Sequence, residues 1–231
     1  MTRAASSRRN RPNPLSSEEV DPSSQPSADA WWREDFGDRY AGLIFDCDGT
    51  LTDSMPLHYI AWRDTMATYG VTFVEEKFYA MGGMPSEKII AILSDEQQRV
   101  VDAAEASEAK EQAFVDQMHL LKARHDVVHL AKAHRNRVAM SVASGGIRPI
   151  VQQQLAVIGV GDWFPVVVTS EDTVRHKPEP DVFLLAAERM GVAADRCLVL
   201  EDSPLGLEAA RRASMDCIDV RDGSLHRAGL G

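Results

Sequence analysis

The feature of this sequence that most constrains its fold is a series of short apolar runs that alternate with helical patterns. Short β-rich runs separated by helices are typical of a parallel sheet that is covered on both faces. Gly191 stands where the C-terminal cap of a helix is expected. We therefore expect an α/β fold with a Rossmann-like parallel sheet core. The expected strands are residues 40–45, 138–143, 166–169, 197–200 and 217–220, and the expected helices are residues 148–158, 181–190 and 205–213.

About 90 residues without a convincing strand separate the first two expected strands, which is too long for a crossover made of one helix. Residues 56–69, 86–93 and 95–135 have helical patterns, and Pro56 suits the first turn of a helix. We therefore expect a helical cap domain that is inserted after the first strand. The expected domains are the cap at residues 55–135 and the α/β core at residues 31–54 and 136–231.

Residues 1–30 differ in composition from the rest of the chain. They are rich in Ser, Pro and Arg and show no apolar periodicity, so we expect a disordered tail. Trp31 and Trp32 mark the point where this tail should meet the core. The tail has no apolar segment of the kind that secretory signals carry, and its prolines disfavour the helix of an organelle transit peptide, which is the alternative interpretation.

Composition limits the kinds of partner and the location that we expect for this chain of 231 residues. The net charge of −10 argues against nucleic acid as the main partner, because phosphate backbones select basic surfaces. The three cysteines, Cys47, Cys197 and Cys217, lack metal-ligand spacing and indicate reduced thiols in a cytoplasmic protein. No apolar run approaches the roughly 20 residues that span a bilayer. No coiled-coil pattern calls for an obligate partner, so we expect a monomer.

Two aspartates at the end of the first expected strand carry the most specific chemistry. Asp46 and Asp48 are two residues apart, so their side chains can project to the same side, and Gly49 then turns the chain. Carboxylates this close repel, so the pair persists only with a cation between them or a proton on one of them. Metal-assisted phosphoryl transfer uses both arrangements.

Polar segments also follow three other expected strands, at the sheet edge where open parallel sheets build their sites. Ser144 and Gly145 offer a hydroxyl and free backbone N–H groups to a phosphate. Lys177 supplies a point charge, and Glu201 and Asp202 supply hard oxygen ligands that suit magnesium. Each segment alone has an ordinary alternative, namely a turn, a loop or a helix cap. Their occurrence together, each at a strand end, predicts a phosphoryl-transfer site.

These motifs resemble those of haloacid dehalogenase superfamily phosphohydrolases with a helical cap after the first strand. The resemblance covers residues 39 to about 220. Residues 39–46, followed by His58 and residues 61–63, are similar to the β-phosphoglucomutase-like subgroup. They look closest to bacterial phosphatases that act on fructose 1-phosphate and 6-phosphogluconate, and residues 176–185 resemble the same group.

The resemblance implies a role for each motif residue. Asp46 would be the nucleophile that becomes an aspartyl phosphate, and Asp48 would be held protonated to supply the leaving group with its proton. Ser144, Gly145 and Lys177 would hold the phosphoryl oxygens. The implied Mg²⁺ ligands are Asp46, the backbone carbonyl of Asp48, Asp202 and Glu201, of which Glu201 would bind or orient the ion.

Two residues of the expected cap are further candidates for substrate contacts. His58 would orient Asp48 or the substrate, as relatives with a histidine at this place suggest, and the alternative is an ordinary helix histidine. Ser86 ends a loop, residues 82–86, that looks like the substrate-specificity loop of the cap, and the alternative is a plain connection between helices.

The function that we expect is a magnesium-dependent phosphatase of a small sugar or sugar-acid phosphate. The main alternative is a sugar phosphomutase, but mutase relatives carry an arginine in the cap loop where this chain has Ser86 or Glu87, with only Lys88 nearby. A dehalogenase is a weaker alternative, because haloacid-cleaving relatives do not need the second aspartate and Asp48 would have no role. A non-catalytic binding protein would be plausible if a catalytic residue were missing, and none is.

Overall fold

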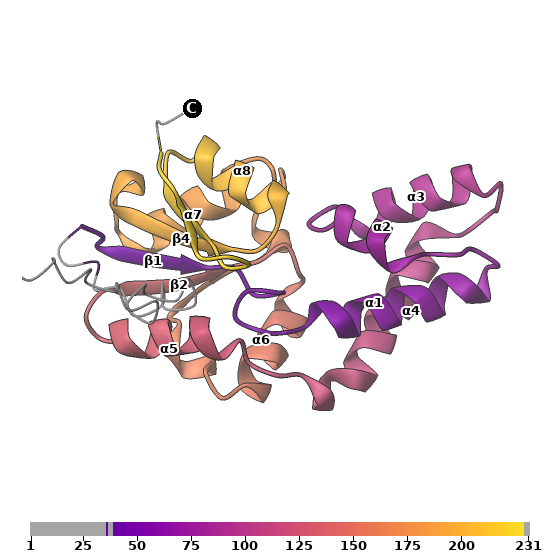
Figure 1. Cartoon of the computed structure of the whole chain (residues 1–231), viewed down its shortest axis with the longest axis horizontal. Coiled ribbons are helices and arrows are strands. Elements are labelled where there is room, and N and C mark those ends of the chain that lie inside the picture. The colour runs from indigo at the N-terminus through magenta and orange to yellow at the C-terminus, as the bar shows by residue number, and fades with distance from the viewer. Residues whose placement is uncertain (1–35, 37–38, 229–231) are drawn as a thin grey trace, which may run out of the picture.

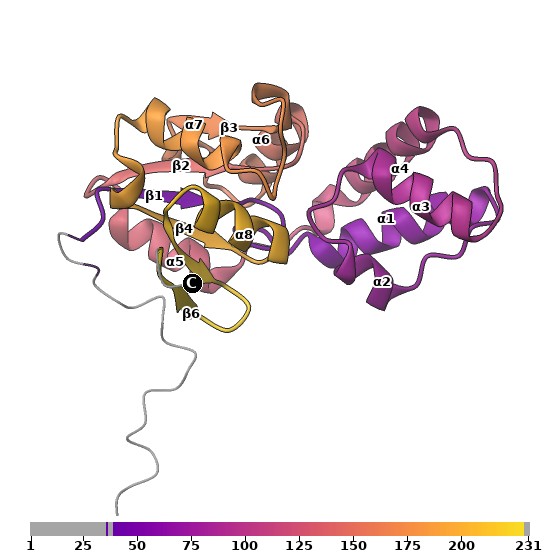
Figure 2. The ribbon, with the colours of Figure 1, turned by 90° about the horizontal axis from the view of Figure 1, so that it is seen from above.

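The structure is a computed structural model, and it describes residue 36 and residues 39–228. The predicted tail of residues 1–30, together with Trp31 and Trp32, lies outside the described residues. The described part forms two lobes, which are an α/β core and a smaller group of helices beside it (Figures 1 and 2).

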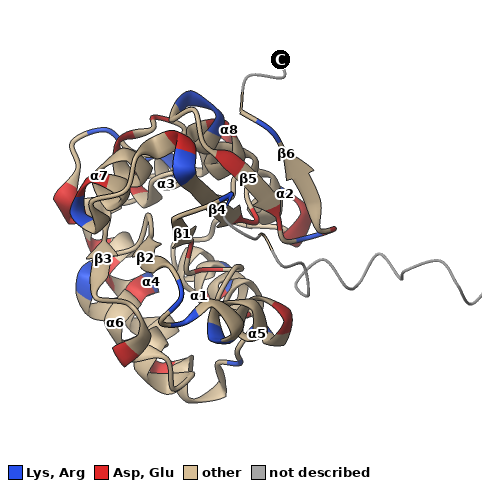
Figure 3. Ribbon diagram, turned by 90° about the vertical axis from the view of Figure 1, so that its left-hand side faces the viewer, with Lys and Arg blue, Asp and Glu red and all other residues tan. Residues whose placement is uncertain are grey.

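The core is built on one mixed sheet. Its strands are β1 (Gly42–Phe45), β2 (Ala139–Ala143), β3 (Val166–Val168), β4 (Cys197–Glu201), β5 (Asp216–Asp219) and β6 (Ser224–His226). Among the described residues their order is β3-β2-β1-β4-β5-β6 (Figure 3), with β1 to β5 parallel and β6 antiparallel. This topology confirms the expected α/β class and places β1 between β2 and β4.

Helices cover both faces of the sheet because apolar side chains alternate along its strands. In β1, Leu43 and Phe45 pack on one face and Ile44 packs on the other. The helices on the first face are α5 (His125–His134) and α6 (Arg148–Val157), and those on the second are α7 (Asp181–Met190) and α8 (Pro204–Arg212). Gly191 caps α7 with a left-handed backbone, φ 68°, as its position in the sequence predicts.

The second lobe, on the right in Figure 1, packs its helices around an apolar cluster of its own. Trp62 and Met66 lie at its centre, together with Leu93. The helices of this lobe are α1 (Met55–Thr68), α2 (Glu75–Ala80), α3 (Ser86–Glu96) and α4 (Ala103–Gln117). We call α1 to α4 the helical lobe.

The structure differs from the expected helical insert at its C-terminal end. The expected run of helix over residues 95–135 is interrupted, because α4 ends at Gln117 and α5 begins at His125. Helix α5 lies within the range 55–135 that we expected for the cap, but it buries Val127 and Leu130 against the sheet. Its packing therefore places α5 with the core.

The ends of the strands also differ by one or two residues from those predicted from the sequence. Strand β5 covers Asp216–Asp219 instead of residues 217–220. Asp216 enters the strand because its carboxylate accepts hydrogen bonds from the Tyr40 hydroxyl at 2.6 Å and from Arg39 at 2.8 Å. A charge that is paired in this way can be buried in a strand, which a hydropathy pattern does not show.

Two chain segments connect the lobes, and they pair side by side. The Arg124 N–H donates to the Leu51 carbonyl at 2.9 Å, and the Asp53 N–H donates to the Lys122 carbonyl at 2.8 Å. The Arg124 guanidinium also donates to the Gly49 carbonyl at 3.1 Å. The link between the lobes is therefore hydrogen-bonded to the turn that follows β1.

Charged residues are spread over both lobes. Figure 3 shows Lys and Arg interspersed with Asp and Glu along the ribbon. Several form exposed ion pairs within one helix, such as Arg211 with Glu208 in α8. No described helix is at once long enough and apolar enough to cross a membrane.

Candidate active site

The candidate site lies at the carboxyl end of β1, which Asp46 directly follows. The Asp46 N–H donates to the Leu200 carbonyl of β4 at 3.0 Å, which holds this residue between two central strands. Lys177 Nζ lies 2.7 Å from Asp46 Oδ1 and 2.7 Å from Glu201 Oε1. All three charged side chains are buried, so solvent screens these ion pairs little. Segments that are far apart in the sequence therefore meet at Asp46, as predicted.

The crowding of charges shifts the pKa values of this group. Burial raises the pKa of Asp46 to about 7, with Lys177 opposing the rise and Glu201 and Asp48 adding to it. Burial alone would lower the pKa of Lys177, but the charges of Asp46 and Glu201 hold it above its ordinary value. Lys177 is therefore an ammonium ion at neutral pH.

Asp202 adds a third carboxylate to this cluster. One carboxylate oxygen from each of Asp46, Glu201 and Asp202 lies within 4.8 Å of the others. Burial raises the pKa of Asp202 to about 9, and the charges of Glu201 and Asp46 contribute to the rise. Three buried carboxylates beside one ammonium carry more negative than positive charge, and hard oxygen ligands at this spacing suit a divalent ion such as Mg²⁺.

The two carboxylates from the end of β4 differ in what they contact. Glu201 Oε1 accepts from Lys177, and Glu201 Oε2 accepts from the Ser203 N–H at the start of α8. Within the described part of the chain, the hydrogen-bond contact of Asp202 is a long one, 3.4 Å from the Thr50 hydroxyl to Asp202 Oδ1. Asp46 and Asp202 are therefore the carboxylates best able to hold a cation, and Glu201 orients Lys177.

Two glycines make room for these acids. Gly49 has a φ of +79°, and a Cβ at this position would overlap the Asp202 carboxylate. A Cβ at Gly206, in the first turn of α8, would overlap the Glu201 carboxylate. Replacing either glycine would displace a carboxylate of the cluster.

Asp48 lies in a different environment from Asp46. Its Oδ1 accepts hydrogen bonds from the Ser54 hydroxyl at 2.8 Å, from His58 Nε2 at 2.8 Å and from Gln154 Nε2 at 2.9 Å. Burial would raise the pKa of Asp48, but His58 and these hydrogen bonds hold it well below its usual range. In the free protein these three donors therefore stabilise the carboxylate form of Asp48, and its protonation in the first step stays a prediction.

The loop after β2 lies beside Asp48. Ser144 is buried, and its hydroxyl oxygen accepts from the Gly146 N–H at 3.0 Å. A Cβ at Gly146 would lie 3.6 Å from Asp48 Oδ2. The loop therefore faces Oδ2, whereas the three donors contact Oδ1. A Cβ at Gly145 would meet nothing within 4 Å, so space alone does not require a glycine there.

The helical lobe contributes His58, which sits in α1. Its ring stacks on Phe114 of α4 with centroids 3.8 Å apart. Burial lowers the pKa of His58, an effect that Lys110 reinforces and Asp48 opposes. A neutral ring that donates its Nε2–H to Asp48 fits this environment.

Ser86 has a less direct relation to the site. It is the first residue of α3, and the loop before it approaches the core at Gly83. A Cβ at Gly83 would lie 3.3 Å from both the Ser203 hydroxyl and the Leu205 side chain of α8. The loop of residues 82–86 thus lies against the core next to the acidic cluster, and a substrate contact by Ser86 stays a prediction.

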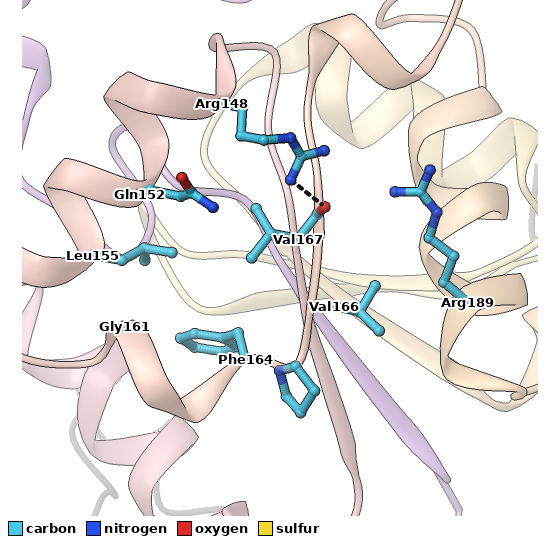
Figure 4. A pocket seen from close by; sticks show the side chains of 9 residues that line it. Arg148, Gln152, Leu155, Gly161, Phe164, Val166, Val167 and Arg189 are labelled. Carbon is cyan, nitrogen blue, oxygen red and sulfur yellow. Dashed lines mark hydrogen bonds between the residues drawn. The ribbon is translucent and has the colours of Figure 1, made fainter.

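A pocket of about 490 Å³ lies elsewhere, along β3 at the edge of the sheet (Figure 4). None of the described residues that line it is a predicted site residue. Its two arginines, Arg148 and Arg189, both pair with Asp172, and Arg148 also donates to the Val167 carbonyl at 3.2 Å. Because these guanidinium groups are already paired, the pocket is a poor candidate for a phosphate site.

Sequence reasoning missed Gln154 and Thr52. Gln154 is fully buried, and it connects Thr52 to Asp48 through its amide group. One signal could have found it. In the helical pattern of residues 148–158, Gln154 falls on the same face as the apolar Ile150 and Val151. A polar side chain at such a position needs a buried partner.

Comparison with known proteins places this geometry in a family context. The haloacid dehalogenase-like hydrolase family model matches residues 43–220, which is most of the described chain. Over 188 residues the chain is 38% identical to the fructose-1-phosphate phosphatase YqaB of Escherichia coli (strain K12), and the match covers 80% of this chain and 98% of that protein. It is also 27% identical over 181 residues to a phosphorylated carbohydrates phosphatase of Thermotoga maritima, covering 76% of this chain and 82% of that protein.

The fold is similar to that of solved structures as well. The crystal structure of CbbY from Rhodobacter sphaeroides in complex with phosphate superposes with a TM-score of 0.70 at 26% sequence identity. This match covers 78% of the present chain and 85% of that chain.

Proposed function

The chain belongs to the haloacid dehalogenase-like hydrolase family, and from this premise we propose that it hydrolyses a small sugar phosphate through an aspartyl phosphate on Asp46. The observation that carries the proposal is the arrangement around Asp46. A buried ammonium, Lys177, lies 2.7 Å from the carboxylate that would attack. A second carboxylate, Asp48, follows two residues later, with one oxygen facing the loop at Ser144.

In the first step, a carboxylate oxygen of Asp46 attacks phosphorus, and the bond from phosphorus to the sugar oxygen breaks. Asp48 gives a proton to the departing sugar oxygen, and the sugar leaves with that proton as its hydroxyl. The donors on Asp48 Oδ1 favour its carboxylate form in the free protein, so Asp48 takes up a proton, from the substrate's phosphate monoanion or from solvent, as the negative phosphoryl group arrives beside it and raises its pKa. Lys177 and the Ser144 loop supply positive charge and donors to the phosphoryl oxygens.

In the second step, water attacks the phosphorus of the aspartyl phosphate. Asp48, now a carboxylate, takes the proton of that water, and the bond from phosphorus to Asp46 breaks. Inorganic phosphate leaves, Asp46 is again a free carboxylate, and Asp48 releases the proton that it took from the water to solvent, which restores its ionised form. The three donors on Asp48 Oδ1 support the carboxylate form that this step requires.

We also propose that Asp46, Asp202 and the backbone carbonyl of Asp48 hold Mg²⁺. Their oxygen chemistry and the raised pKa values of both aspartates fit a divalent ion. When bound, the ion would offset the negative charge that Asp46, Asp202 and the phosphate bring together. Glu201 would orient the Lys177 ammonium, with which it forms an ion pair.

The substrate class rests on the relatives, whose names state that they act on fructose 1-phosphate and on phosphorylated carbohydrates. The loop of residues 82–86 closes the side of the site next to α8, and we propose that it contacts the sugar. The cytoplasmic location and monomeric state that the sequence favours stay predictions.

The test is phosphate release from a panel of sugar and sugar-acid phosphates, with Mg²⁺ and with a chelator. We expect release from fructose 1-phosphate or a close analogue, and loss of that release with the chelator. Glucose 1-phosphate with a bisphosphate primer serves as the mutase arm. Conversion to glucose 6-phosphate without release of inorganic phosphate would overturn the hydrolase assignment.

A further inference from the structure

We propose that Gln154 is a positioning residue that fixes which oxygen of Asp48 faces the substrate. This inference rests on the proposed function, because it assigns Gln154 a part in the proton transfer by Asp48. Gln154 lies in α6 on the core and does not reach the acidic cluster around Asp46. Its role would be exerted entirely through Asp48.

Both ends of the Gln154 amide are used. The side chain is fully buried, and a buried amide without partners would cost stability. Gln154 Nε2 donates to Asp48 Oδ1 at 2.9 Å, and Gln154 Oε1 accepts from the Thr52 hydroxyl at 2.9 Å. The amide therefore forms a buried link between Asp48 and the turn that follows it.

The charge of Asp48 and the hydroxyl of Thr52 together select one orientation of this amide. A carboxylate only accepts hydrogen bonds, so it favours the NH₂ end of Gln154 and disfavours the carbonyl end. Thr52 is fully buried as well, and its single hydroxyl hydrogen is shared between the carbonyl end of Gln154, at 2.9 Å, and the Cys47 carbonyl, at 3.0 Å. Without Thr52, the carbonyl end of Gln154 would lose this donor.

The donors around Asp48 all reach the same oxygen. Ser54, His58 and Gln154 donate to Oδ1, and in the part of the chain that the structure describes no group donates to Oδ2. Oδ2 instead faces the loop at Gly146. The plane of the carboxyl group is thus fixed with Oδ2 toward the place where the leaving oxygen would need a proton.

Gln154 differs from the other two donors in where it is anchored. Ser54 and His58 belong to the start of α1, whose later residues pack in the helical lobe. Gln154 belongs to α6, whose Val151 and Leu155 pack on the sheet. A shift of the helical lobe relative to the core would carry His58 with it and leave Gln154 in contact with Asp48. Gln154 is therefore the donor that holds the acid in place when the lobes move.

This role predicts an effect that depends on the leaving group. A sugar alkoxide needs a proton to depart, whereas the acetate of acetyl phosphate departs without one. Acetyl phosphate is also smaller than any sugar phosphate, so it fits the same site. The ratio kcat/KM reports the steps up to departure of the first product, so it isolates the step in which Asp48 acts as an acid.

The experiment compares Gln154→Met with the matched exposed control Gln153→Met, using fructose 1-phosphate and acetyl phosphate as substrates. For Gln154→Met we expect kcat/KM to fall about 30- to 100-fold on fructose 1-phosphate and less than about 3-fold on acetyl phosphate. Gln153→Met should change neither. Thr52→Val should show the same selective loss at smaller size, and Thr52→Ser should restore most of the activity.

Equal losses on both substrates, or no loss on fructose 1-phosphate, would overturn the inference while the wild-type activity upheld the proposed function. Equal losses together with a lowered melting temperature would assign Gln154 a purely structural role. A wild-type protein that releases phosphate from neither substrate would contradict the proposed function itself, and the inference with it.

Discussion

Lys177 is the residue on which the balance of charge at the site depends. It is the ammonium that pairs with both Asp46 and Glu201 inside the protein, at 2.7 Å from each. Breaking a buried ion pair by removing one partner leaves an uncompensated buried charge. The stability of the core and the reactivity of Asp46 should therefore both depend on this one side chain.

We predict that Lys177→Met abolishes phosphate release and lowers the free energy of unfolding by about 3 kcal/mol or more in metal-free buffer. Asp46→Asn should abolish release with a much smaller loss of stability, because it removes one of several crowded acids. Urea unfolding of both variants with a chelator present measures the difference. Equal stabilities for the two variants would contradict the assigned charge balance.

A second residue-scale prediction concerns pH. The pKa values of Asp46 and Asp202 are raised, to about 7 and about 9, so the folded protein binds these protons more tightly than the unfolded chain does. The stability that they contribute is present below the ordinary carboxyl pKa and is lost as the pH rises through 7 and 9. The melting temperature of the metal-free protein should therefore fall between pH 6 and pH 9.

Mg²⁺ should reverse this fall, and its stabilising effect should grow with pH because protons compete for the same oxygens. In Asp202→Asn the fall above pH 8 and most of the response to Mg²⁺ should disappear. Thermal melts at pH 6, 7.5 and 9, with Mg²⁺ and with a chelator, provide the measurement. A response to Mg²⁺ of the same size at every pH would argue against these carboxylates as its site.

At this scale the sequence was most informative where a residue type has one chemical use. Asp46, Lys177 and Asp202 could be placed at strand ends, and the structure brings them together. Gln154 could not be identified, because Gln152, Gln153 and Gln154 look alike in the sequence and only helix phase distinguishes the buried one. The lowered pKa of Asp48 was also beyond prediction, since it depends on three donors from different parts of the chain.

At the scale of elements, the contribution that can be tested most closely is that of the link between the lobes to stability. Arg124 joins this link to the core, since its guanidinium donates to the Gly49 carbonyl at 3.1 Å and to the Val220 carbonyl at 2.8 Å. Gly49 belongs to the turn that follows β1, next to Asp48. Arg124 is therefore in a position to connect the link between the lobes with this turn.

We predict that Arg124→Met lowers the free energy of unfolding by about 2 kcal/mol, because two carbonyls lose charged donors. The matched control is Arg211→Met, which removes an exposed pair and should cost less than about 0.5 kcal/mol. Chemical denaturation of both variants tests the pair of values. Similar small losses for Arg124→Met and Arg211→Met would show that the link between the lobes does not depend on this contact.

Long elements with clear periodicity could be predicted from the sequence, and short or context-dependent ones could not. Helices α6 and α7 begin at the expected residues, and α7 also ends where expected. Helix α2 and strand β6 went unpredicted because six and three residues are too few to show a period. The placement of α5 on the core depends on tertiary packing, since its pattern shows an apolar face but not the surface that the face meets.

At the scale of the whole molecule, the helical lobe meets the core near the acidic cluster at Gly83. A side chain at this position would press on Ser203 and Leu205, and its φ of +79° disfavours any residue other than glycine. A side chain at Gly159, φ +74°, would bring the same backbone strain, but its Cβ would meet nothing within 4 Å. Substitutions at Gly83 and Gly159 therefore distinguish the effect of backbone strain from the effect of contact between the lobes.

We predict that Gly83→Ala and Gly159→Ala both lower stability, each by about 1 kcal/mol, as expected for a residue forced into left-handed backbone. Only Gly83→Ala should change catalysis, raising KM for the sugar phosphate several-fold by holding the lobes apart. Steady-state kinetics beside thermal melts distinguish the two effects. An unchanged KM in Gly83→Ala would mean that this contact plays no part in substrate binding.

The most direct test of the whole account is to trap the covalent intermediate. Wild-type protein would be mixed with fructose 1-phosphate and Mg²⁺, quenched in acid within one turnover, digested, and examined by mass spectrometry. The account predicts one phosphoryl group on the peptide that contains Asp46, and none in Asp46→Asn. Substrate turnover with the phosphoryl group on another residue, or with an Asp46→Asn variant that still releases phosphate, would contradict it.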